Sequence, residues 1–165
     1  MATLGHEKAC PATGLGWVRA PGIMRTLGKE TILEPPTCKV IASGAPYEGR
    51  QGFTYLAGLT GATAQSRAIC MTVLTLPPGA RAKTHLHEGI ETAVYVFEGE
   101  VEMYFGEGLA HRLVARGGEY VYIPPDMPHR VMNNSGAAVR ALVAHTAADD
   151  QDGIVMLPEL DALHG

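Results

Sequence analysis

The chain has 165 residues, a length expected of one domain that buries a substantial core. Apolar residues make up 46% of the sequence and charged residues 18%, as is usual for a soluble globular protein. The net charge of −4 and the lack of a basic cluster argue against nucleic acid as a partner. No apolar run is long enough to span a membrane, so a membrane protein is not expected either.

The N-terminal residues and the cysteines indicate a cytoplasmic protein. Residues 6–8 (HEK) are polar and no apolar stretch follows them, so no signal peptide is expected. Cys10, Cys38 and Cys70 are odd in number and widely spaced, which favours reduced thiols over disulfides.

Residues 1–39 are predicted to form an irregular arm. Several glycines and prolines interrupt any regular period there. Trp17, Ile23 and Leu33 require burial, so we expect the arm to pack along the domain or a neighbouring subunit.

Residues 40–148 are predicted to form one all-β domain. A first short strand is expected over 40–42, a glycine-spaced loop over 44–63, and a strong strand over 67–76. Alternation places Cys70, Thr72, Leu74 and Leu76 on one face of that strand. Residues 98–100 are expected to form the corner of a hairpin. The further expected strands are a His-x-His strand after Gly79, then 92–97, 101–105, 111–115, 119–123, 129–132 and 139–146. Such regularly spaced short strands are typical of a β-sandwich or barrel. Residues 149–165 are predicted to be a C-terminal tail whose apolar stretch IVMLPEL forms one short strand or turn of helix.

Two clusters in this domain have the composition of a metal site. His85 and His87 are one residue apart, so both side chains point to the same face of a strand. Glu91 follows within reach, and His129 lies in a second cluster, PPDMPH. Three imidazoles and one carboxylate suit a divalent transition metal ion such as Fe, Mn, Ni, Co, Cu or Zn. We therefore predict that His85, His87, Glu91 and His129 bind one such ion.

The two clusters together resemble the motifs of the cupin superfamily. Gly79, His85, His87, Glu91 and Gly99 fill the roles of the first motif. The second motif is filled by Gly118, Pro124, His129 and Asn133, with Asp126 where glycine is usual. The resemblance implies a double-stranded β-helix (jelly-roll) barrel with a metal in its mouth, and a homodimer.

One spacing departs from the family pattern. The distance from His87 to Gly99 would place the carboxylate at position 92, which is Thr92, so Glu91 is one residue early. A shift of one residue turns a side chain to the other face of a sheet. Glu91 therefore reaches the ion only if a bulge absorbs the extra residue, and otherwise the site consists of three histidines with water.

The resemblance implies a small metal-dependent enzyme acting on a small oxygenated molecule. A dioxygenase is the first expectation, followed by a decarboxylase, isomerase or cyclase, because the fold alone does not choose among them. A non-catalytic sensor that binds a small ligand through the ion is the alternative, and a metal-free sugar-binding barrel is a third. Glu91, Lys83 and Tyr95 are weak catalytic candidates, whereas the isolated His111 and His145 are not expected to touch the ion.

Overall fold

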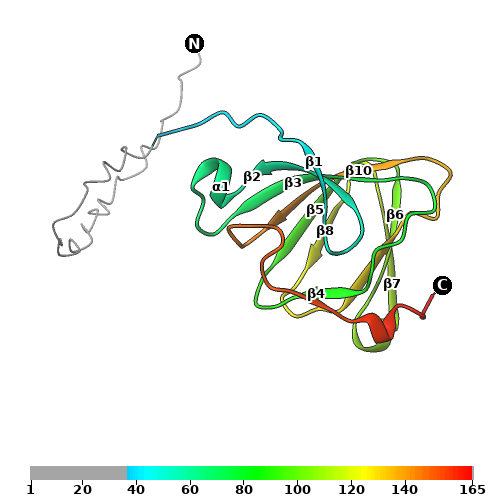
Figure 1. The fold of residues 1–165 in the computed structure, drawn as a ribbon. Coiled ribbons are helices and arrows are strands. Elements are labelled where there is room, and N and C mark those ends of the chain that lie inside the picture. The colour runs from blue at the N-terminus through cyan, green and yellow to red at the C-terminus, as the bar shows by residue number, and fades with distance from the viewer. Residues whose placement is uncertain (1–36, 165) are drawn as a thin grey trace, which may run out of the picture. The chain divides into compact units, whose positions relative to one another are not determined.

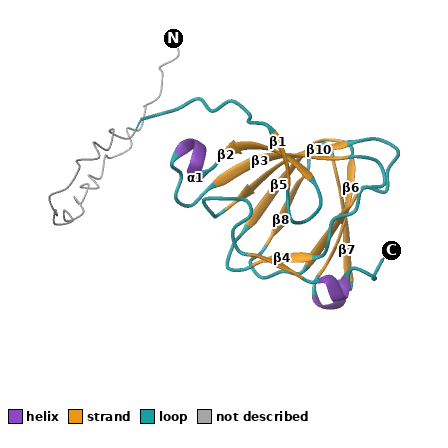
Figure 2. Ribbon diagram, viewed as in Figure 1, coloured by secondary structure: helices purple, strands orange, loops and turns teal. Residues whose placement is uncertain are grey.

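Two antiparallel β-sheets make up the fold in the computed structural model, which describes residues 37–164 (Figures 1 and 2). The first sheet has the strand order β1 (Pro46–Glu48), β2 (Thr54–Leu59), β3 (Cys70–Leu76), β10 (Val139–His145), β5 (Thr92–Glu98) and β8 (Tyr120–Ile123). The second has the order β11 (Ile154–Met156), β4 (His85–His87), β9 (His129–Met132), β6 (Glu100–Phe105) and β7 (His111–Arg116). The helical segments are short: α1 (Gly61–Ala64), η1 (Glu107–Leu109) and η2 (Pro158–Leu160). The predicted all-β jelly-roll is confirmed.

The core lies between the inner faces of the two sheets, and strand alternation selects its residues. Along β3 and β10 every second side chain is buried. The predicted face of β3, with Cys70, Thr72, Leu74 and Leu76, is the buried one. Apolar side chains of both sheets meet these residues, among them Val96, Val101, Met103, Ile123 and Val139. The alternation read from the sequence therefore fixes which side of each strand faces the interior.

The chain changes sheets at Gly99, where the sequence led us to expect a hairpin. β5 pairs with β10 and β8, whereas β6 pairs with β7 and β9. Gly99 has a φ of +89°, and a Cβ there would lie 2.9 Å from the carbonyl oxygen of Ala138. Glycine is thus required by a sharp crossing between the sheets, so the hairpin prediction was wrong.

The N-terminal part of the described chain also differs from the prediction. Residues 40–42 form no strand, and the segment expected to be a loop contains β1, β2 and α1. Phe53 and Tyr55 are buried in the core, and Tyr47 packs against it. The glycines of this segment lie in turns and close approaches between strands, while its aromatic residues supply the burial that holds two strands on the sheet.

The C-terminal segment beyond residue 148 is part of the second sheet. β11 pairs with β4, with Ile154 opposite His87 and Met156 opposite His85. The buried Arg130 of β9 donates hydrogen bonds of 2.6 and 2.7 Å to the carbonyl oxygens of Asp161 and Leu163. The segment predicted as a tail therefore supports β4.

The predicted arm of residues 1–39 lies almost entirely outside the described residues. No helix in residues 37–164 has the length and apolar character that crossing a lipid bilayer requires.

Asn133 joins the ends of three segments through its side chain. Its amide nitrogen donates to the carbonyl oxygens of Leu76, Pro77 and Ala137 at 2.8–3.1 Å. Its amide oxygen accepts from the backbone and hydroxyl of Ser135. Asn133 itself is fully buried, so its loss would open a space in the interior where these segments meet.

We predict that Asn133→Ala destabilises the domain by about 2–4 kcal/mol, since it removes the donor that ties Leu76, Pro77 and Ala137 together at a fully buried position. Urea unfolding measures this loss. The neighbouring Asn134→Ala is the matched control, because Asn134 is exposed and its loss should cost no more than about 0.5 kcal/mol. Equal losses in the two variants would contradict the structural role of Asn133.

Candidate metal centre

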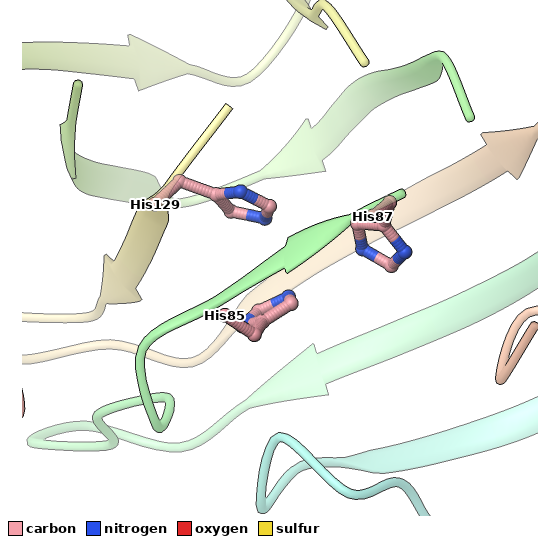
Figure 3. Close-up of side chains that lie close together, drawn as sticks. All are labelled: His85, His87 and His129. Atoms are coloured by element: carbon pink, nitrogen blue, oxygen red, sulfur yellow. The ribbon is translucent and has the colours of Figure 1, made fainter. Parts of the chain in front are cut away.

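His85, His87 and His129 converge because β4 and β9 are neighbours in the second sheet. His85 lies directly opposite His129 in the register of these strands. His85 and His87 have the same parity on β4, and the burial of that strand alternates accordingly. All three side chains therefore point to the inner side of the sheet, where their rings lean toward one another (Figure 3).

The distances suit a shared ion. One ring nitrogen from each histidine lies within 4.8 Å of those from the other two. The ring centroids of His85 and His129 are 4.3 Å apart, and those of His85 and His87 are 5.1 Å apart. Imidazole nitrogens bind a metal at about 2.0–2.1 Å, so ligand atoms of one ion lie within about 4.2 Å of each other. Only small side-chain adjustments separate this group from a ligand set.

Hydrogen bonds to carbonyl groups fix the tautomers of two rings. His85 Nδ1 lies 2.8 Å from the carbonyl oxygen of Lys83, and His129 Nδ1 lies 2.9 Å from that of Met127. A carbonyl oxygen can only accept, so each Nδ1 carries the proton and donates. In the neutral ring, Nε2 then has the free lone pair, which is the arrangement of a metal-binding histidine. His87 differs, because its Nδ1 is buried and has no hydrogen-bond partner.

Burial keeps the three imidazoles neutral. Desolvation, with smaller effects of the neighbouring histidines, lowers the pKa of His85 well below 6.5 and that of His87 to about 3. Desolvation likewise lowers the pKa of His129 to about 4, against the hydrogen bond to Met127, which raises it. Lone pairs that converge in a buried site require a partner with positive charge or a donated proton. These residues fit a divalent transition metal ion.

Glu91 does not join this group. It is exposed, and its carboxylate accepts a hydrogen bond of 2.8 Å from the hydroxyl of Tyr122. β5 pairs in unbroken register with β8 from its first residue, where Thr92 lies opposite Ile123. Thr92 faces inward, so the preceding residue faces outward, and no bulge of the kind that Glu91 needed is present. The placement of Glu91 beside the histidines is therefore corrected, which leaves the three-histidine arrangement.

The weaker catalytic candidates lie outside the site as well. Lys83 is exposed, because the strand begins only at His85 and the alternation that would have aligned the two does not extend back to it. Tyr95 points away from the interior, where its ring contacts Phe97 and Tyr120. Lys83 would share the face of His85 only if the strand began before residue 83, and Tyr95 lies on the outward face of β5.

His145 lies beside the histidine group, although it is not among the three residues whose ring nitrogens converge. Its ring centroid is 4.7 Å from that of His87, and only 5% of the residue is exposed. Its Nδ1 lies 2.8 Å from the hydroxyl oxygen of Thr92, the residue opposite it on β5. A signal was present in the sequence, because His145 has the parity of the buried Val139, Ala141 and Val143.

A cavity of about 50 Å³ opens between these groups. The four histidines line it together with polar Gln51 and Thr92 and with apolar side chains, including Phe53, Tyr55, Val94 and Ile123. A site of this size holds a few water molecules or a small ligand group.

Part of this domain matches a known protein family. The model of the Cupin domain family matches residues 72–145, which span β3 to β10 and contain all four histidines. No curated protein sequence matches the chain.

Solved structures with a double-stranded β-helix share the fold. An uncharacterised protein from Klebsiella pneumoniae has a TM-score of 0.50 and 18% identity, with 55% of this chain and 76% of that chain covered. A variant of oxalate decarboxylase from Bacillus subtilis has a TM-score of 0.57 and 24% identity, with 68% and 30% covered. A predicted oxalate decarboxylase from Thermotoga maritima has a TM-score of 0.54 and 17% identity, with 65% and 93% covered. This chain thus spans about a third of the Bacillus subtilis enzyme, and identities this low show the shared fold only. Residues 72–145 thus match the Cupin domain family, and the two-sheet barrel with histidines on β4 and β9 agrees with that match.

Proposed function

We propose that this protein is a metal-dependent enzyme that acts on a small oxygenated organic molecule, with dioxygenase chemistry as the first reaction to test. Decarboxylation, isomerisation and cyclisation follow as alternatives on the same site. The observation that carries the proposal is the buried group of His85, His87 and His129, whose neutral rings face one cavity. The homodimer and the cytoplasmic location inferred from the sequence stay predictions.

The three histidines would hold the ion through one ring nitrogen each. A divalent ion with three neutral ligands retains its charge and open positions, so it would polarise substrate oxygens and, if redox-active, exchange electrons. The carbonyl groups of Lys83 and Met127 hold two of the rings in the required tautomer. The strands β11 and β6 flank β4 and β9, so the backbone that carries the ligands is fixed on both sides.

The interior of the barrel indicates what kind of molecule fits. A second cavity, also about 50 Å³ and lined only by apolar residues, shares Leu74, Val94, Ile123 and Val131 with the histidine cavity. A substrate with oxygen atoms at one end and a short apolar part at the other matches this pair of cavities. The small volumes argue against a nucleotide or an oligosaccharide as the group that enters.

We predict that His85→Ala and His129→Ala each lose most of the bound metal while the barrel stays folded. The purified proteins would be stripped with chelator, reloaded with Fe(II), Mn(II), Co(II) or Zn(II), and analysed for metal content and circular dichroism. Glu91→Gln should retain the wild-type metal content, because Glu91 faces away from the site. Exposed His111 gives the matched control His111→Ala. Full metal content in His85→Ala would show that the site is misplaced.

We expect the reloaded wild-type protein to consume oxygen or form product with at least one candidate among catechols, thiols and diketones. Oxygen uptake and chromatography of the mixture measure this, with His129→Ala as the inactive control. Tight ligand binding without turnover across the panel would contradict the enzyme and favour the sensor. If the wild-type protein takes up none of the four ions, the metal-free sugar-binding barrel is the hypothesis that remains.

The stability of the metal-free protein should fall as the pH is lowered from 7.5 to 5. Histidines of the unfolded chain bind protons near pH 6.5, whereas the folded pKa values of His87 and His129 are about 3 and 4. The unfolded state therefore binds more protons throughout this window. At pH 5 this lowers the free energy of unfolding by on the order of 1–2 kcal/mol for each buried histidine. Urea unfolding at both pH values measures the loss. His87→Gln removes one titrating group and should reduce the loss, so an unchanged pH dependence in that variant would contradict the prediction.

A further inference from the structure

His145 and Thr92 form a buried polar pair beside the three-histidine group. They lie opposite each other on β10 and β5, and their exposed fractions are only 5% and 3%. His145 Nδ1 and Thr92 Oγ1 are 2.8 Å apart. Neither residue has a role in the site as described so far, and His145 lines the same cavity as the other histidines.

The hydroxyl of Thr92 determines which nitrogen of His145 carries the proton. Among the residues that the structure describes, His145 Nδ1 is the one hydrogen-bond partner of this hydroxyl. Donation to Nδ1 spares this buried hydroxyl group the cost of an unmade hydrogen bond, which favours Thr92 as the donor and Nδ1 as the acceptor. The proton of the neutral ring then resides on Nε2.

This tautomer is the reverse of that in His85 and His129. Their Nδ1 atoms donate to carbonyl oxygens, which leaves a lone pair on Nε2 for an ion. In His145 the Nε2 carries a hydrogen and cannot bind an ion in this state. The distances agree, because the nitrogens that lie within 4.8 Å of one another belong to the other three histidines.

We propose that His145 donates a hydrogen bond from Nε2 to an anionic oxygen of a ligand held at His85, His87 and His129, and that Thr92 is the positioning residue that sets its tautomer. The ligand part of this proposal rests on the proposed function, whereas the tautomer does not. No acidic side chain is among the described residues that line the cavity, so the charge of the ion is not offset by the protein. A positive ion next to a neutral donor selects a carboxylate or enolate oxygen over a neutral hydroxyl group.

The tautomer can be measured on the metal-free protein. Two-bond ¹H–¹⁵N correlations of the imidazole rings at pH 7.5 should show His145 with its proton on Nε2, and His85 and His129 with theirs on Nδ1. Thr92→Val removes the hydroxyl group and should move His145 to a mixture of tautomers, whereas Thr92→Ser should keep the wild-type form. A proton on Nδ1 of His145 in the wild-type protein would overturn the proposal.

Anion binding tests the ligand part with cobalt as a spectroscopic probe. The Co(II)-loaded protein would be titrated with acetate at pH 7.5 and followed by its visible spectrum. His145→Leu should keep the cobalt content but bind acetate about tenfold more weakly or worse, since it loses a hydrogen bond to a charged group. His145→Gln retains an N–H donor and should recover most of the affinity.

Two outcomes would overturn the ligand part. Unchanged acetate affinity in His145→Leu would show that no donor acts there, and loss of cobalt would show that His145 is itself a ligand. If His145→Leu does not fold, Thr92→Val carries the same test through weaker acetate binding at full cobalt content. A wild-type protein that binds no cobalt contradicts the proposed function and the ligand part together, while the tautomer measurement still decides the role of Thr92.

Discussion

The pairing of β4 with β9 is the constraint on which the candidate site depends. These strands are 42 residues apart in the chain when counted from His87 to His129, and the register between them places His85 directly opposite His129. Every other feature of the site follows from this pairing, since the parity of β4 brings in His87 and the inner side of the sheet supplies burial. The supports of the pair are themselves distant in sequence, because β11 covers one side of β4 and β6 covers one side of β9.

The parts of the site that the sequence predicted are those that follow from local alternation. His85 and His87 share a face because they are two residues apart, and the inward face of β3 was read in the same way. Glu91 was misplaced because the choice between residues 91 and 92 depends on whether a bulge is present, which β8 and β10 decide from outside the segment. β1 and β2 were missed because their aromatic residues are held by distant core partners, while their glycines suggested a loop. His145 was missed because its neighbours in space are His87 and Thr92, which are far away in sequence.

The inward residue at the start of β5 sets the charge of the site without altering the fold. Thr92 occupies the position at which the motif spacing would place a carboxylate, and its side chain is buried toward His145. A carboxylate there would add a negative charge to the lining of the cavity, whereas a hydroxyl group adds none. The backbone pairing of Thr92 with Ile123 and His145 is independent of that choice. The same barrel can therefore present ions of different effective charge, which is one physical reason why the fold alone does not identify the reaction.

Whether a buried histidine in this barrel accepts an ion or donates a hydrogen bond depends on the partner of its other nitrogen. A backbone carbonyl group can only accept, so Lys83 and Met127 force the proton of their histidines onto Nδ1. A hydroxyl group can donate, so Thr92 allows the opposite arrangement in His145. His85, His129 and His145 thus take different roles through the partners of their Nδ1 atoms. The distances agree with this division, because the ring nitrogens that converge belong to His85, His87 and His129.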